Sequence, residues 1–105
     1  MTARRDQPEK RIQLQIIQYL KLKGFAVGKI KTTGARRGDT FLKDIYHFRG
    51  LPDLIAFTPA LVFIEVKAPG GRLSPVQKDF QEFCRHAGTP YIIAFSLDDI
   101  MRAFP

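Results

Sequence analysis

Gly50-Leu51-Pro52-Asp53-Leu54 and, further along, Phe63-Ile64-Glu65-Val66-Lys67 are the stretches that decide how this chain folds. Apolar runs of this length are typical of buried strands. Asp53 stands at the start of one run, and Glu65 and Lys67 are two residues apart in the other. Ionisable groups in buried strands cost free energy unless they pair with one another or hold a metal ion. The two stretches therefore indicate a site.

The spacing of the two runs predicts a β-hairpin. Residues 54–57 and 61–66 are rich in Leu, Ile, Val and Phe, and the short Pro-containing segment 58–60 separates them. Two β-like runs joined in this way are typical of a hairpin. We expect Phe57 to face Leu61, and this pairing fixes the register of all the residues on both strands.

In that register Asp53 faces Glu65, and Lys67 follows on the same side because side chains alternate along a strand. Directly opposed residues lie roughly 4.5–5.5 Å apart at Cβ, so two carboxylates repel each other there unless a cation lies between them. Mg²⁺ or Mn²⁺ prefers such oxygen ligands. Lys67 can orient a water molecule or stabilise negative charge on a phosphate. The alternative is a solvated strand end with a Glu–Lys ion pair.

The wider pattern resembles a known family. Three segments carry the resemblance: Gly50-Leu51-Pro52-Asp53-Leu54, Ile64-Glu65-Val66-Lys67 and Gly71-Arg72-Leu73-Ser74-Pro75-Val76-Gln77. Together they resemble the VRR-NUC branch of the PD-(D/E)XK nucleases, over a region from about Glu9 to Ile100. The resemblance implies an α/β fold with a restriction-endonuclease-like α-β-β-β-α-β core, in which helices flank a mixed central sheet. It also implies a Mg²⁺- or Mn²⁺-dependent endonuclease.

The resemblance assigns roles to individual residues. The implied catalytic residues are Asp53, Glu65, Lys67, Glu9 and Gln77. The implied metal ligands are Asp53, Glu65 and the backbone carbonyl of Val66, with Glu9 as a further candidate. The residues themselves leave two of these roles open. Glu9 is also an acid favoured in the first turn of a helix by the helix dipole, and Gln77 also completes a capping box with Ser74.

Size and charge limit the possible functions. The chain of 105 residues is expected to form one domain, residues 1–105, with residues 1–6 as a frayed tail. It has no room for a separate substrate domain. The net charge of +7 and the isoelectric point of about 9.9 favour a polyanionic partner such as DNA. A basic domain without such a partner is the alternative.

The segment from residue 31 to residue 49 interleaves basic and aromatic residues. Basic side chains contact phosphates, and aromatic rings stack on unpaired bases. A solvated loop, or one that meets a second subunit, is the alternative. His47 is not assigned a catalytic role. The candidate DNA-binding residues are Lys31, Arg36, Arg37, Lys43 and Arg49, together with Arg72 in the Gly-rich turn after the hairpin.

The single cysteine and the hydropathy pattern bear on the location of the protein. Cys84 cannot form an internal disulfide, which favours a reducing environment, and a packing role is expected for it. No apolar run approaches the ~20 residues that span a bilayer. Residues 1–10 show no apolar secretory segment. We therefore expect an intracellular protein without membrane contact. We also expect no small-molecule cofactor.

Periodicity predicts the remaining elements. A helix starts near Pro8 and stops at Gly24, a strand covers 25–30, and a helix follows the cap at Ser74 and ends at Gly88. A strand at 91–95 and a short helix from Ser96 or Leu97 to Met101 complete the chain. The buried stripe expected on the second long helix is Val76, Phe80, Phe83 and Ala87.

The function predicted from these features is hydrolysis of a DNA phosphodiester by a metal-activated water. The resemblance points to a homodimer that cuts four-way (Holliday) junctions, because two nicks on symmetric strands need two sites at fixed spacing. The alternatives are a non-catalytic DNA-binding module with the same fold, a nuclease for flaps or other branched DNA, a sequence-specific restriction enzyme and an RNA nuclease.

Overall fold

Helices and strands follow one another in the order that the sequence predicts. The computed structural model describes residues 7–30 and 48–105. In chain order, its elements are α1 (Gln7–Leu22), β1 (Ala26–Lys29), β2 (Leu54–Phe57), β3 (Leu61–Val66), α3 (Pro75–Ala87), β4 (Tyr91–Ala94) and α4 (Leu97–Ala103).

The β2–β3 hairpin is the centre of the sheet. The two strands pair antiparallel, with Phe57 opposite Leu61 as expected. Continuing this register one residue before β2 places Asp53 opposite Glu65. The hairpin therefore brings the two acidic residues to the same end of the sheet.

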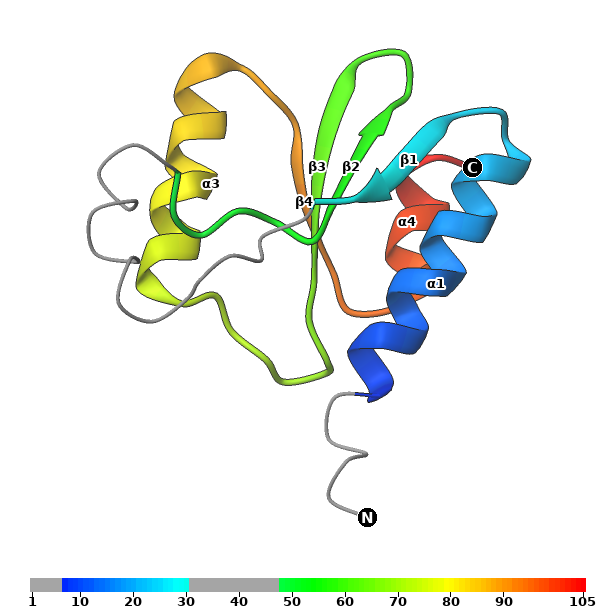
Figure 1. Cartoon of the computed structure of the whole chain (residues 1–105), viewed down its shortest axis with the longest axis horizontal. Coiled ribbons are helices and arrows are strands. Elements are labelled where there is room, and N and C mark those ends of the chain that lie inside the picture. The colour runs from blue at the N-terminus through cyan, green and yellow to red at the C-terminus, as the bar shows by residue number, and fades with distance from the viewer. Residues whose placement is uncertain (1–6, 31–47) are drawn as a thin grey trace.

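The sheet has four strands in the order β1-β2-β3-β4. The β1–β2 and β2–β3 pairs are antiparallel, and β4 runs parallel to β3. Helix α3 lies on one face of the sheet, while α1 and α4 lie on the other (Figure 1). This arrangement confirms the predicted mixed sheet flanked by helices.

Capping residues define the ends of the long helices. Helix α1 is followed by Gly24, whose φ of 91° suits glycine, and the Phe25 N–H donates to the Leu20 carbonyl at 3.0 Å. Helix α3 begins at Ser74 with the predicted capping box and Pro75 in its first turn. It ends at Gly88 in the left-handed conformation.

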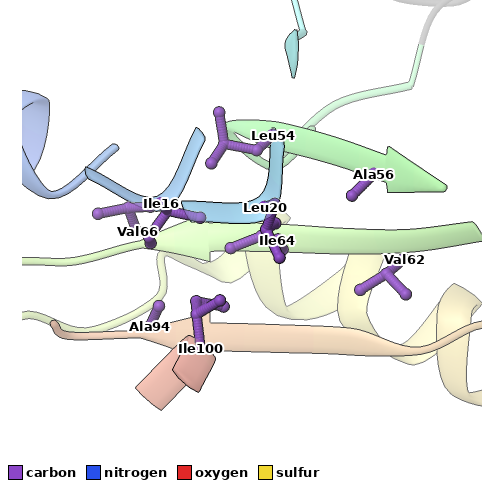
Figure 2. Close-up of a cluster of buried hydrophobic side chains, with 9 residues drawn as sticks. All are labelled: Ile16, Leu20, Leu54, Ala56, Val62, Ile64, Val66, Ala94 and Ile100. Atoms are coloured by element: carbon purple, nitrogen blue, oxygen red, sulfur yellow. The ribbon is translucent and has the colours of Figure 1, made fainter. Parts of the chain in front are cut away.

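The main core lies between the sheet and the α1–α4 pair (Figure 2). Helix α1 contributes Ile16 and Leu20, and α4 contributes Ile100, all fully buried. They meet the alternate residues of the strands that point to this face, which are Leu54, Ala56, Val62, Ile64, Val66 and Ala94. The face that packs against α1 and α4 is thus entirely apolar at its centre.

Some sequence expectations differ from the structure. On α3 the buried residues are Phe80 and Cys84, whereas Phe83 is 52% exposed and Ala87 is exposed. The prediction that Phe83 and Ala87 are buried was therefore wrong, because the helix turns Cys84 and not Phe83 toward the sheet. The first strand is shorter than expected, since Phe25 and Ile30 lie outside β1. No helix among the described residues is long and apolar enough to cross a membrane.

Candidate active site

Asp53 is held by hydrogen bonds to the strands on both sides of it. Its main-chain carbonyl accepts a hydrogen bond from the Ile30 N–H at 2.9 Å, next to β1. Its side-chain Oδ2 accepts one from the Val66 N–H at 2.8 Å, at the end of β3. These bonds fix both the backbone and the carboxylate, so Asp53 is oriented before any ligand arrives.

Glu65 is the one charged residue among the buried residues that the structure describes, and it is 3% exposed. Its Oε2 accepts a hydrogen bond from the Gln77 side-chain amide at 3.1 Å and lies 3.5 Å from the Lys67 Nζ. Its Oε1 is buried and has no hydrogen-bond partner in the described part of the chain. An unpaired buried carboxylate oxygen is costly, which makes Oε1 a natural ligand atom.

Gln77 links the start of α3 to the site. Its Oε1 accepts a hydrogen bond from the Ser74 N–H at 2.8 Å, and the Gln77 N–H donates to the Ser74 hydroxyl at 3.3 Å. Since the amide oxygen is held by the cap, the amide N–H is directed to Glu65. The Gln77 side chain thus completes the cap and also contacts Glu65, so the two roles that the sequence left open are geometrically compatible.

Lys67 and Glu9 lie at the edges of the carboxylate pair. The Lys67 side chain is 16% exposed, so part of it reaches solvent. The Glu9 Oε2 accepts a hydrogen bond from the Ala68 N–H at 3.1 Å, which ties the first turn of α1 to the residues after β3. Glu9 also lies close enough to raise the pKa values of Asp53 and Glu65 through its charge.

Both carboxyl groups of the pair resist ionisation. Burial, and then the negative charge of Asp53, raise the pKa of Glu65 to about 7, while Lys67 opposes the rise. Burial also raises the pKa of Asp53, against the Val66 N–H hydrogen bond and the charge of Lys67, which lower it. Two facing acids of this kind are stabilised as carboxylates by a cation between them.

The available ligand atoms fit a hard divalent cation that is bound by only a few protein groups. Within residues 7–30 and 48–105, no group of three or more Asp, Glu, His or Cys side chains is arranged to hold a metal ion. The side-chain ligands available are therefore the Asp53–Glu65 pair, with Glu9 engaged by a main-chain N–H. Val66 lies between Glu65 and Lys67 and is fully buried. Mg²⁺ is bound in many proteins by one or two carboxylates plus phosphates and waters.

Most of the expected DNA contacts lie outside the described residues. Lys31, Arg36, Arg37 and Lys43, with His47, fall in the segment that the structure does not describe. Arg49 is exposed and lines a hollow beside α3. Arg72 is exposed in the turn between β3 and α3.

Gly50 lies in close contact with the first turn of α3. It has a φ of 74°, and a Cβ added there would lie 2.2 Å from the Val76 carbonyl oxygen and 2.7 Å from the Gln77 nitrogen. Only glycine fits this approach. The contact holds the residues leading to Asp53 against the turn that carries Gln77.

Sequence reasoning missed Tyr91. Its Cα partner across the parallel β3–β4 pair is Phe63, so Tyr91 shares the α3 side of the sheet with Glu65. Its hydroxyl is buried without a partner among the described residues, and burial followed by the charge of Glu65 raises its pKa. The strand signal at 91–95 was visible in the sequence, but the parallel pairing that brings Tyr91 to Glu65 was not.

Cys84 is buried on α3, and burial raises the pKa of its thiol. A raised thiol pKa disfavours the thiolate that a nucleophile needs. The packing role expected for Cys84 agrees with this position.

Comparison with known proteins identifies the group to which this fold belongs. The family model for the VRR-NUC domain matches residues 7–96. A solved VRR-NUC domain superposes with a TM-score of 0.70 at 21% identity, covering 93% of this chain and 98% of that one. A solved VRR-NUC domain protein superposes with a TM-score of 0.64 at 20% identity, covering 91% and 84%. At such identities the structural likeness shows the fold. No curated protein matches the chain.

Proposed function

Because this chain belongs to the VRR-NUC family of nuclease domains, we propose that it is a Mg²⁺- or Mn²⁺-dependent endonuclease that hydrolyses DNA phosphodiesters. The observation that carries the proposal is the facing pair formed by Asp53, which is half-buried, and Glu65, which is buried. One oxygen of that pair, Glu65 Oε1, has no partner in the described part of the chain, although it is buried beside a second acid.

Asp53, Glu65 and the Val66 carbonyl are the proposed ligands of the divalent cation, and Glu9 is a further candidate. A divalent cation bound by carboxylates supplies Lewis-acid chemistry, in which a coordinated water becomes more acidic and a phosphate oxygen is polarised. The chain's own groups prepare this site. The Val66 N–H orients Asp53, and Gln77 fixes one oxygen of Glu65.

Lys67 is the proposed electrostatic catalyst. Its ammonium lies 3.5 Å from a Glu65 oxygen, on a side chain that is partly exposed, and we expect it to bind the scissile phosphate. A cation held in this position stabilises the negative charge that develops on the phosphate as the attacking water approaches. Neither Cys84 nor Ser74 is available as a covalent nucleophile, because the Cys84 thiol is buried and the Ser74 hydroxyl serves the helix cap.

The substrate that we propose is a four-way DNA junction, cut by a homodimer. One protomer has one carboxylate pair, whereas symmetric resolution of a junction needs two nicks. A two-fold dimer supplies two sites at fixed spacing. The net charge of +7 supports a polyanionic partner of this kind.

The test is cleavage of labelled four-way junction, flap, single-stranded and linear duplex DNA in Mg²⁺, Mn²⁺ or EDTA. We expect metal-dependent nicking of the junction by the wild type, and none by Asp53→Ala or Lys67→Ala. Matched controls are Asp98→Ala and Lys21→Ala, which remove exposed charges on α4 and α1 that are not among the proposed site residues.

Each result separates one part of the proposal from the rest. Cutting in EDTA, or full activity in Asp53→Ala, would overturn the mechanism. Equal cutting of all four substrates would overturn the choice of junctions alone. DNA binding without cutting in any metal would favour a non-catalytic DNA-binding module. Light scattering measures the mass on and off DNA, and a monomer in both states would contradict paired nicking.

Metal binding has its own readout, which does not depend on activity. A ligand that binds only the folded state stabilises it in proportion to its concentration and affinity. We expect Mn²⁺ to raise the melting temperature of the wild type and not that of Asp53→Ala. An equal rise in both proteins would contradict the assignment of Asp53 as a ligand.

A further inference from the structure

A hollow of about 290 Å³ lies on the α3 side of the molecule, and the described residues that line it are Phe48, Arg49, Val76, Asp79 and Phe83. Phe48 is 65% exposed and Phe83 is 52% exposed, so both rings present faces or edges to solvent. The proposed catalytic residues do not line it. The proposed catalytic site does not account for these exposed aromatic rings beside a guanidinium and a carboxylate.

The rings of the hollow are held in place from below. Phe48 packs edge-on against the buried Phe80, with ring centroids 5.6 Å apart, and lies 5.9 Å from Phe83. Phe80 in turn packs edge-on against Phe63 of β3 at 5.2 Å. The exposed rings therefore rest on an aromatic stack that reaches the sheet, which reduces the entropy that they would lose on binding a flat ligand.

The hollow is connected to the carboxylate pair through the backbone. Gly50 follows Arg49 and is packed against the first turn of α3, where Val76 lines the hollow and Gln77 binds Glu65. Asp53 lies at the end of the same short segment. A ligand seated in the hollow thus contacts Arg49 and Val76, the immediate chain neighbours of Gly50 and Gln77.

We propose that this hollow binds one unpaired nucleobase of the DNA substrate, next to the phosphodiester that is cut. The inference rests on the proposed function and specifies its substrate. Phe48 and Phe83 offer the apolar surface on which an unpaired base stacks. Arg49 contacts the phosphate attached to that base, as basic residues do in DNA complexes.

The carboxylate of Asp79 indicates which bases fit. A carboxylate repels phosphate, but it accepts hydrogen bonds from the exocyclic amino groups of cytosine and adenine. Guanine also offers such an amino group, whereas unpaired thymine offers a carboxylate only its ring N3–H. We therefore expect the hollow to prefer an unpaired base that carries an amino group over thymine.

The alternative occupant is a second copy of the chain. A stable protein–protein contact typically uses ~20–30 residues on each side, far more than the residues that line this hollow. The mixture of rings, one guanidinium and one carboxylate suits a small amphipathic ligand better than a broad apolar interface. We therefore assign the hollow to DNA, and the oligomeric state of the variants tests the other possibility.

The experiment is an abasic scan of a four-way junction and of a flap, with binding measured in EDTA so that no cleavage occurs. We expect one position beside the cut phosphate at which loss of the base weakens wild-type binding about 5- to 100-fold, the range typical of base–aromatic stacking. Phe48→Ala and Phe83→Ala should weaken binding of the intact substrate similarly. Their effect should disappear on the substrate that is abasic at that position. Phe57→Ala, which removes an equally exposed ring (54%) at the far end of β2, is the control and should bind normally.

The outcomes distinguish this inference from the proposed function. If the wild type binds and cuts junctions but the scan is flat, the base site is wrong and the nuclease proposal stands. If the two Phe variants lose as much affinity on abasic as on intact DNA, the base site is also wrong. If they convert a dimer to a monomer in light scattering, the hollow is a contact between copies. If the protein binds a substrate with thymine at the sensitive position as tightly as one with cytosine, the role of Asp79 is wrong. Absence of both binding and cutting would overturn the proposed function and this inference together.

Discussion

The face of the sheet that packs against α1 and α4 differs from the α3 face in composition and in proposed role. On the α1–α4 face, Ile64 and Val66 are fully buried in an apolar cluster (Figure 2). On the α3 face, the residue between them, Glu65, is also buried but carries a carboxyl group whose pKa is raised by burial. Because side chains alternate along β3, a single residue step separates the group that stabilises the fold from the group proposed to serve catalysis. The comparison teaches that stability and chemistry can be changed separately in this chain.

The largest expected effect is on the apolar face. Ile64→Ala should reduce the free energy of unfolding by about 2–5 kcal/mol, since it leaves a cavity among Ile16, Leu54 and their neighbours. Urea denaturation measures the change. Leu22→Ala, at a site 87% exposed, should change it by less than about 0.5 kcal/mol. Similar losses for both variants would contradict the division between the faces.

On the other face, Lys67→Met should affect rate and not stability. The substitution keeps the aliphatic stem of the side chain and removes the ammonium beside Glu65. We expect cleavage to slow by about 10²–10³-fold, the usual effect of removing one electrostatic group from an active site. The free energy of unfolding should stay within about 1 kcal/mol of wild type. A folded variant with the wild-type rate would remove Lys67 from the mechanism.

The pH dependence of stability separates Glu65 from its neighbours. Its pKa rises from 4.5 to about 7 on folding, so its contribution to stability is fully present below pH 4.5 and is lost as the pH rises through 7. In metal-free buffer, the free energy of unfolding of the wild type should fall between pH 5 and pH 8, by up to about 3 kcal/mol from this group.

Glu65→Gln should show a smaller fall across the same pH range, because it cannot ionise. Asp53 keeps its own contribution, which has the same sign since its pKa is also raised. Mn²⁺ should restore the stability of the wild type at pH 8. Thermal melts at each pH measure these changes, and a wild type whose stability rises from pH 5 to pH 8 would contradict the direction of the shift.

The smallest effect is expected at Tyr91. Its hydroxyl is buried without a partner in the described part of the chain, so Tyr91→Phe removes a group that gains nothing in the free protein. The free energy of unfolding should be unchanged or rise by about 1 kcal/mol. A loss larger than that would show that the hydroxyl is hydrogen-bonded in solution. Denaturation of the two proteins side by side decides the question.

Much of this fold could be predicted from local sequence rules. The apolar runs and their separation fixed the hairpin register, and Ser74, Pro75 and Gln77 fixed the start of α3, because these signals act over a few residues. The facing of Asp53 and Glu65 follows from that register. The sequence could not show that Gln77 both caps α3 and contacts Glu65, since a glutamine at this position suits either role.

Other features depend on long-range packing. The parallel pairing of β4 with β3 joins segments separated by α3, and it alone brings Tyr91 near Glu65. The exposure of Phe83 depends on the rotation of α3 over the sheet, which leaves Cys84 buried in its place. Periodicity alone does not settle such a rotation when both faces of a helix carry apolar residues.

The close approach of Gly50 to α3 has a mechanical consequence. Main-chain atoms of Val76 and Gln77 lie directly against Gly50, so the segment before Asp53 has no room to move closer to the helix. A bulky substrate therefore cannot gain room by pressing the Gly50–Asp53 segment toward α3, and the space that it needs has to come from movement away from this contact.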